Sequence, residues 1–190
     1  MRLFIGIPLP GEYAPIIREI QEAWKKRLAS KMSWVRPELV HLTLRFLGDV
    51  DESRVADVVS AMRVAAGVNF QAQGGQGGVF PSRGAPRVVW IGLGQGRDEC
   101  AANFQKLERE LIKAGFAAES KPFSPHLTVA RIKAAARTDD WPGLLADLNR
   151  DWPLFTVDRL VLWQSILKSS GPEYRRVAEV ELTGGDQVRS

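Results

Sequence analysis

The 190-residue sequence contains only two histidines, and each of them begins the same short string. The first string is His41-Leu42-Thr43-Leu44 and the second is His126-Leu127-Thr128-Val129, so two of the five threonines stand two places after the two histidines. Imidazole gains and loses a proton near neutral pH, and a hydroxyl can bond a phosphate oxygen. Two such pairs could hold one phosphate and move protons on both sides of it.

The spacing within each string is that of a β-strand. Side chains alternate along a strand, so His41 and Thr43 share one face while Leu42 and Leu44 enter the core behind them, and the second string repeats the pattern. A single histidine in an apolar strand is more often a core residue, but two identical contexts favour a common site. Two histidines without carboxylate or thiolate companions do not predict a metal site.

Strands and helices alternate around both strings. Strand patterns cover residues 3–7, 40–47, 87–93, 155–157, 160–167 and 174–182, the second string is also strand-like, and helical periodicity covers 11–28, 51–66, 98–113 and 138–148. Gly115 is a predicted helix stop, and Gly171-Pro172 a predicted turn. The glycine-rich segment 74–78 is interpreted as a turn or loop, because no Lys-Ser or Lys-Thr follows it as in a phosphate-binding loop.

A strand, a helix and a histidine-bearing strand therefore occur in that order twice, with the histidines 85 residues apart. This repetition predicts an α+β fold of two similar lobes whose sheets face a common groove. The sequence leaves open whether each lobe is a continuous half of the chain.

Composition limits the classes of protein. With 45% hydrophobic residues the chain can form one compact domain, and its apolar runs are too short for a membrane helix or, with Pro8 and Pro10 near the start, for a signal peptide. We expect a soluble, cytoplasmic monomer that does not bind membranes. Cys100 is the single cysteine, which excludes an intramolecular disulfide and a cysteine-based metal cage. The net charge of +4 favours polyanionic partners without identifying one.

The paired strings resemble the signature motifs of the 2H phosphoesterase superfamily. Neighbouring blocks resemble its prokaryotic branch, the RNA 2′,3′-cyclic phosphodiesterases, also called 2′-5′ RNA ligases. The blocks span residues 2–7, 41–48, 80–92, 123–131 and 162–165, so the resemblance covers nearly the whole chain. Members of the family often have tyrosine where this chain has Trp163 or Gln164.

The resemblance implies that residues 1–190 form a single 2H phosphoesterase domain of two pseudo-symmetric lobes. Its fold would be bilobal α+β, with two antiparallel sheets, helices outside and an active-site cleft between the lobes. The implied reaction is hydrolysis of 2′,3′-cyclic phosphate ends of RNA to 2′-phosphomonoesters by two histidines, without a metal or other cofactor. A weak reverse reaction could join tRNA halves through a 2′-5′ bond, when a 5′-hydroxyl takes the place of water.

The resemblance also assigns roles to individual residues. His126 would be the proton acceptor that activates water, and His41 the proton donor to the leaving 3′-oxygen. Thr43 and Thr128 would bind the non-bridging phosphate oxygens. Arg131 could also bind the phosphate, although strict alternation places it on the core side, so that a bend in the strand would be required.

Several other residues are candidates for binding RNA. Arg45 shares the face of His41 by alternation, and Phe46 and Trp163 could stack on a terminal base, although core packing is an alternative role for both. A diffuse positive rim could be formed by Lys121, Lys133, Arg175 and Arg176.

The sequence alone leaves two alternative functions open. One is a phosphodiesterase that acts on 2′-5′-linked oligonucleotides or on other small cyclic phosphates. The other is an RNA-binding module without turnover.

Overall fold

The structure is a computed structural model that describes residues 1–169 and 171–184. Its strands are β1 (Arg2–Pro8), β2 (Lys31–Trp34), β3 (His41–Asp49), β4 (Phe70–Phe80), β5 (Val88–Gln95), β6 (His126–Ala134), β7 (Leu154–Val157), β8 (Arg159–Lys168) and β9 (Gly171–Glu181). Its helices are α1 (Tyr13–Lys25), α2 (Val55–Ala65), α3 (Arg97–Lys113) and α4 (Trp141–Ala146), with 3-10 turns at η1 (Pro37–Leu39) and η2 (Glu52–Arg54).

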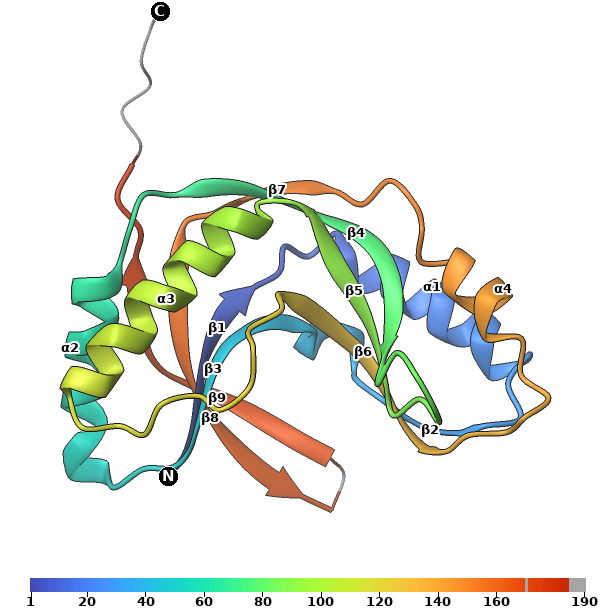
Figure 1. Ribbon diagram of the computed structural model, residues 1–190, viewed down its shortest axis with the longest axis horizontal. Coiled ribbons are helices and arrows are strands. Elements are labelled where there is room, and N and C mark those ends of the chain that lie inside the picture. Colours follow the sequence, from blue (N-terminus) through green and yellow to red (C-terminus); the bar gives the residue numbers. More distant parts are fainter. Residues whose placement is uncertain (170, 185–190) are drawn as a thin grey trace, which may run out of the picture.

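The strands form one curled antiparallel sheet (Figure 1) in the order β7-β4-β5-β6-β3-β1-β8-β9, and β2 pairs with β6 beside β3. The α+β class is confirmed. The two predicted sheets are continuous, because β3 and β6 are joined by the pairing of Leu42 with Leu127. Strands β8 and β9 from the end of the chain complete the half that contains β1 and β3, while β4 and β5 join β6. The two halves of the sheet are therefore not continuous halves of the chain.

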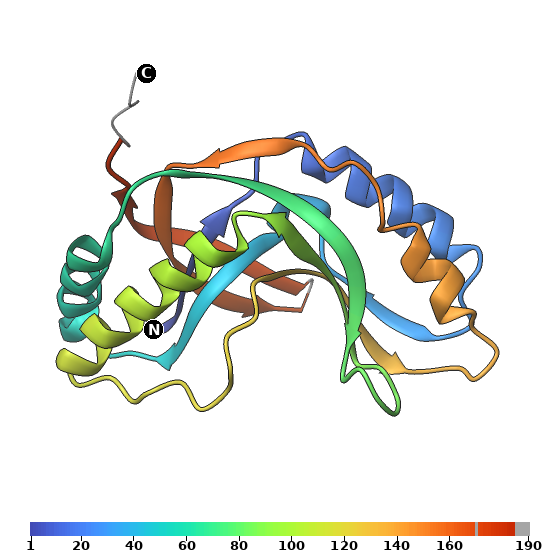
Figure 2. The ribbon, with the colours of Figure 1, turned by 45° about the horizontal axis from the view of Figure 1, so that its top comes forward.

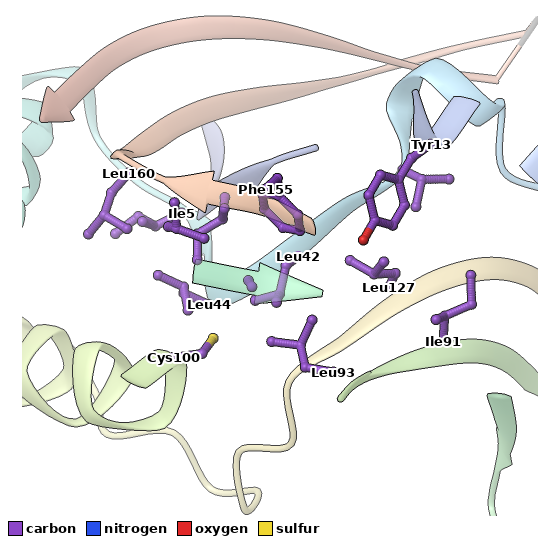
Figure 3. Close-up of a cluster of buried hydrophobic side chains, with 14 of the residues drawn as sticks. Ile5, Tyr13, Leu42, Leu44, Ile91, Leu93, Cys100, Leu127, Phe155 and Leu160 are labelled. Atoms are coloured by element: carbon purple, nitrogen blue, oxygen red, sulfur yellow. The ribbon is translucent and has the colours of Figure 1, made fainter. Parts of the chain in front are cut away.

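The helices pack against one face of this sheet. In Figures 1 and 2, α1 lies beside α4 over one half, and α2 lies beside α3 over the other. Their buried side chains belong to the same apolar cluster as the alternate residues of the strands. Figure 3 shows Leu42, Leu44 and Leu127 in this cluster with Tyr13 of α1 and Cys100 of α3. The remaining alternate side chains of the central strands point to the opposite face.

Most predicted elements are present, with shifted ends. The predicted helix over 51–66 begins with the 3-10 turn η2, and the one over 138–148 is reduced to the six residues of α4. Gly115 ends α3 as predicted, with φ +85° and its N–H donated to the Ile112 carbonyl at 2.9 Å. Gly171 and Pro172, predicted as a turn, belong instead to β9, where they pair with Lys168 and Leu167.

The interpretation of segment 74–78 as a turn or loop is wrong, because the segment lies inside β4, where Gly74, Gly77 and Gly78 pair with β5. They are needed for packing. A Cβ on Gly77 would lie 2.4 Å from Cδ1 of Leu148, and a Cβ on Gly78 would lie 2.3 Å from Cζ2 of Trp90. Glycine here allows large side chains to lie directly on the strand.

Replacing Gly78 with alanine is expected to lower the free energy of unfolding by about 1–3 kcal/mol, because Trp90 must move to admit the methyl group. Urea denaturation followed by circular dichroism measures the change. Gly11→Ala is the matched control, since its Cβ would meet nothing within 4 Å, and it should stay within about 0.5 kcal/mol of the wild type. Equal stability of the two variants would show that the Trp90 contact does not require glycine.

Candidate active site

The two histidine strings meet at the junction between the halves of the sheet. Leu42 pairs with Leu127, and the two are 1% and 0% exposed. Because the pairing is antiparallel, the histidine of each string lies opposite the threonine of the other. The four polar side chains therefore share the face opposite the core. We call it the motif face, and it carries His41, Thr43, His126 and Thr128.

Both histidines are held in the same tautomer by a backbone carbonyl two residues earlier. Nδ1 of His41 lies 2.7 Å from the Leu39 oxygen, and Nδ1 of His126 lies 2.7 Å from the Ser124 oxygen. A carbonyl only accepts hydrogen bonds, so Nδ1 carries the proton in each ring. In the neutral rings, Nε2 is therefore the proton acceptor.

The two Nε2 atoms differ in their partners. The Thr43 hydroxyl donates to Nε2 of His41 at 3.0 Å. Across residues 1–169 and 171–184, neither Nε2 of His126 nor the hydroxyl of Thr128 has a hydrogen-bond partner. The lone pair of His126 is thus the one available to a water molecule.

Burial lowers the pKa of both histidines, because desolvation disfavours the charged ring. The bonds to the carbonyls of Leu39 and Ser124 oppose this shift. The pKa of His41 is lowered further by the charge of His126, and that of His126 by Arg131. Since the ordinary pKa of histidine is about 6.5, these lowered pKa values favour the neutral form of both rings at pH 7.

Aromatic rings surround His41. Phe4 stacks on the imidazole at 4.8 Å between ring centroids, Tyr174 meets it edge-on at 5.3 Å, and Trp163 lies at 5.4 Å. These residues come from β1, β9 and β8. Three strands thus fix the orientation of one imidazole.

His126 has a smaller aromatic wall. Phe80 of β4 meets its ring edge-on at 5.2 Å, and Trp90 of β5 lies at 6.5 Å and stacks on Phe80. Neither of these rings was predicted from the sequence as a site residue, nor were Phe4 and Tyr174 on the other side. Phe4 lies within a continuous apolar run, where no alternation marks the face to which it points.

A β-bulge turns Arg131 toward the motif face. Two successive residues of β5 pair with Ala130 and Thr128, so Val129 is an extra residue in the ladder. Val129 and Ala130 are consequently both buried, and alternation is reversed beyond them. This bulge is the bend that was expected if Arg131 is to reach the same face as His126.

A second bulge occurs at the equivalent point of the first string, and it overturns the prediction for Arg45. Two successive residues of β1 pair with Arg45 and Thr43, which makes Leu44 the extra residue. Arg45 is therefore on the core side, 8% exposed, and not on the face of His41. Phe46 takes the place on the motif face and is 58% exposed.

Buried Arg45 ties β3 to the segment that leads to His126. Its guanidinium donates to Glu108 of α3 at 2.7 Å and to the Ala117 carbonyl at 2.5 Å, and it also bonds Glu119 at 3.3 Å. The second oxygen of Glu108 accepts the Glu119 backbone N–H at 2.6 Å. One ion-pair network thus fixes the chain before the second string to the strand of the first.

The other predicted cations lie on the surface. Lys121, Lys133 and Arg175 are exposed, and Arg176 forms an ion pair with Glu179 at 2.8 Å. A surface hollow between α2 and α3 contains none of the motif residues.

Among residues 1–169 and 171–184, no three His, Cys, Asp or Glu side chains are grouped as metal ligands would be. Within the same residues, no helix has the length and hydropathy needed to cross a bilayer.

The sequence matches known proteins over nearly its whole length. A family model described as LigT like Phosphoesterase matches residues 7–90 and again residues 91–174. The RNA 2′,3′-cyclic phosphodiesterase of Thermotoga maritima is 34% identical over 187 residues, which cover 97% of this chain and 97% of that protein. The enzyme of the same name from Aquifex aeolicus is 34% identical over 173 residues, or 88% and 92% of the two chains.

Solved structures have the same fold. A crystal structure of a Thermus thermophilus protein has a TM-score of 0.76 and 27% identity, covering 97% of this chain and 99% of that one. E. coli LigT, crystallised with 3′-AMP, has a TM-score of 0.73 over 96% and 98% of the two chains. At 23% identity, the similarity to E. coli LigT shows only that the two proteins share a fold.

Replacing Arg45 with methionine is expected to lower the free energy of unfolding by about 3–5 kcal/mol, because the carboxylate of Glu108 is left buried without its cation. Chemical denaturation measures the loss. Arg63→Met, on the exposed face of α2, should change stability by less than about 1 kcal/mol. Similar stability of the two variants would refute the structural role of Arg45.

Proposed function

Because this chain belongs to the LigT-like phosphoesterase family, we propose that it is an RNA 2′,3′-cyclic phosphodiesterase that forms 2′-phosphomonoesters. The observation that carries the proposal is the pairing of the two strings, which brings two imidazoles and two threonine hydroxyls to one face. The names of the relatives from Thermotoga and Aquifex support the choice of substrate.

His126 is the proton acceptor in this proposal. Its Nε2 takes a proton from water as the water oxygen bonds to phosphorus. The unoccupied lone pair of this atom supports the assignment, since Nε2 of His41 is engaged by Thr43. The wall of Phe80 and Trp90 keeps the ring oriented during the step.

His41 is the proton donor. As the bond between phosphorus and the ribose 3′-oxygen breaks, Nε2–H of His41 protonates that oxygen, and a free 3′-hydroxyl and a 2′-phosphate result. The donor must be protonated beforehand, and the negative charge of a bound phosphate raises the pKa of a nearby imidazole. Proton exchange with solvent restores both rings after each turnover.

Thr43, Thr128 and Arg131 bind the non-bridging oxygens of the phosphate. The hydroxyl of Thr128 forms no hydrogen bond within the described chain, so it can bind a phosphate oxygen without breaking one. Thr43 exchanges its bond with His41 for one with the phosphate, which also frees Nε2 of His41. Arg131 supplies a positive charge on the same face.

The terminal base stacks on aromatic side chains beside His41. Phe46 is the most exposed ring there, 5.9 Å from Phe4, and half-buried Trp163 stacks on Phe4 at 5.3 Å. Exposed aromatic faces bind single-stranded bases with little sequence preference. These contacts suit RNA ends of varied sequence.

The proposed reaction needs no metal. Replacement of water by a 5′-hydroxyl would give weak 2′-5′ joining of RNA ends such as tRNA halves. We also propose a monomer in the cytoplasm, and one domain of two pseudo-symmetric lobes. Two separate matches of the family model, each containing one histidine string, support the last point.

A substrate comparison separates this function from its alternatives. A dinucleotide ending in a 2′,3′-cyclic phosphate should be hydrolysed to the 2′-phosphate with and without EDTA. Preference for a 2′-5′-linked dinucleotide would favour the first alternative, and binding without turnover would favour the RNA-binding module. Activity that EDTA abolishes would contradict metal-independent chemistry.

His41→Ala and His126→Ala should each lower kcat by about 100- to 10,000-fold, the usual contribution of one general acid or base. Product formation from the cyclic dinucleotide measures the loss. Circular dichroism must show the wild-type fold, since each ring is replaced on the face opposite the core. Wild-type kcat in either folded variant would refute the two-histidine mechanism.

The pH dependence of kcat/KM should be bell-shaped, with its maximum on the acid side of about pH 6.5, the ordinary pKa of histidine. Below both pKa values the base is already protonated, and above both the acid has lost its proton. Burial lowers both pKa values, so the whole profile moves to lower pH. A maximum above about pH 7 would contradict the lowered pKa values.

A further inference from the structure

We propose that Arg36 and the hydroxyl of Tyr174 form a second phosphate subsite, one nucleotide from the reacting phosphate. It binds the phosphate on the 5′-oxygen of the terminal nucleotide. The substrate is then an RNA end or a 5′-phosphorylated nucleotide, in preference to a nucleoside cyclic phosphate. This inference rests on the proposed function.

The backbone holds Arg36 beside both histidine strings. The N–H of Val35 donates to the Val129 carbonyl at 3.1 Å, so Arg36 lies next to the second string. The segment continues through η1 to Leu39, whose carbonyl orients His41. Arg36 is therefore attached at both ends to groups that position the catalytic rings.

The side chain of Arg36 reaches the β8–β9 hairpin. Its Nη2 donates to the Pro172 carbonyl at 2.8 Å. Tyr174, two residues farther along β9, points to the same side of that strand and meets His41 edge-on. Arg36 and His41 are thus both in contact with the same short stretch of β9.

Charges near the phenol agree with this geometry. Burial raises the pKa of Tyr174, and the positive charges of Arg131 and Arg36 oppose the rise. The charges of both guanidinium groups, one on the motif face and the other in the segment before η1, therefore act on the Tyr174 hydroxyl. The charge of Arg131 lowers the pKa of His126 and also opposes the rise in the pKa of Tyr174.

Apart from the bond to the Pro172 carbonyl, the donors of this subsite are not used by protein groups in the described chain. Arg36 forms no other hydrogen bond and no ion pair within the described chain, and its guanidinium has five N–H groups. The neighbouring carboxylate of Glu173 is paired with Lys168. By contrast, buried Arg45 is fully engaged by carboxylates and carbonyls. Uncommitted guanidinium N–H groups and a phenol suit a phosphate oxygen.

The chemistry of an RNA end identifies which phosphate this is. The 2′- and 3′-oxygens of the terminal ribose are both bonded to the reacting phosphorus. The other phosphate of that nucleotide is attached to its 5′-oxygen. A second anion site beside the first therefore selects nucleotides that carry a 5′-phosphate.

Two substrates that differ only in this phosphate test the inference. They are adenosine 2′,3′-cyclic phosphate and the same nucleoside with a 5′-phosphate. Arg36→Met should lower kcat/KM for the 5′-phosphorylated substrate by about tenfold, the value of one charged hydrogen bond. For the substrate without the 5′-phosphate, kcat/KM should stay within about twofold, since it does not reach Arg36.

Two further variants complete the test. Arg36→Lys keeps the charge and a donor for the Pro172 carbonyl, and should lose less than Arg36→Met. Arg63→Met controls for the loss of one positive charge and should alter neither substrate. An equal loss on both substrates, or no loss on either, would overturn the second subsite alone. If the wild type hydrolyses neither of these substrates and also fails to hydrolyse the dinucleotide that ends in a 2′,3′-cyclic phosphate, the proposed function is refuted, and this inference with it.

Discussion

The site depends on the main-chain pairing of Leu42 with Leu127, which joins the two halves of the sheet. Both side chains are buried, so their strands cannot slip by one residue without exposing leucine and burying histidine. The distance between the two imidazoles is consequently set by the spacing of a β-ladder. The segments immediately before β3 and β6 contribute the carbonyls of Leu39 and Ser124, which orient the rings.

Equivalent positions of the two strings differ in chemistry, and this difference gives the site two distinct sides. A bulge at the fourth residue of each string turns the sixth residue to the motif face, where the first string has Phe46 and the second has Arg131. The side of His41 is aromatic and suits a base, while the side of His126 carries the charge. A repeated backbone pattern thus becomes a site whose two histidines have different surroundings.

Two arginines near the strings, Arg45 and Arg36, differ in burial. Arg45 and Glu108 join the chain before His126 to β3, and Arg36 joins the segment before His41 to β9. The first contact is buried and supports the fold, whereas the second leaves donors exposed to solvent. Their different burial explains why one arginine is assigned to stability and the other to binding.

The local elements and the histidine strings could be predicted from the sequence alone. Alternation placed His41 with Thr43 and Leu42 in the core, and periodicity located α1, α2 and α3, because both patterns are properties of a single segment. The features that depend on pairing with a neighbouring strand were decided only by the tertiary structure. The bulges at Leu44 and Val129 arise from pairing with β1 and β5, and they sent Arg45 inward and Arg131 outward against simple alternation. Gly78 belongs to a strand because Trp90 lies across it, a contact that no local pattern contains.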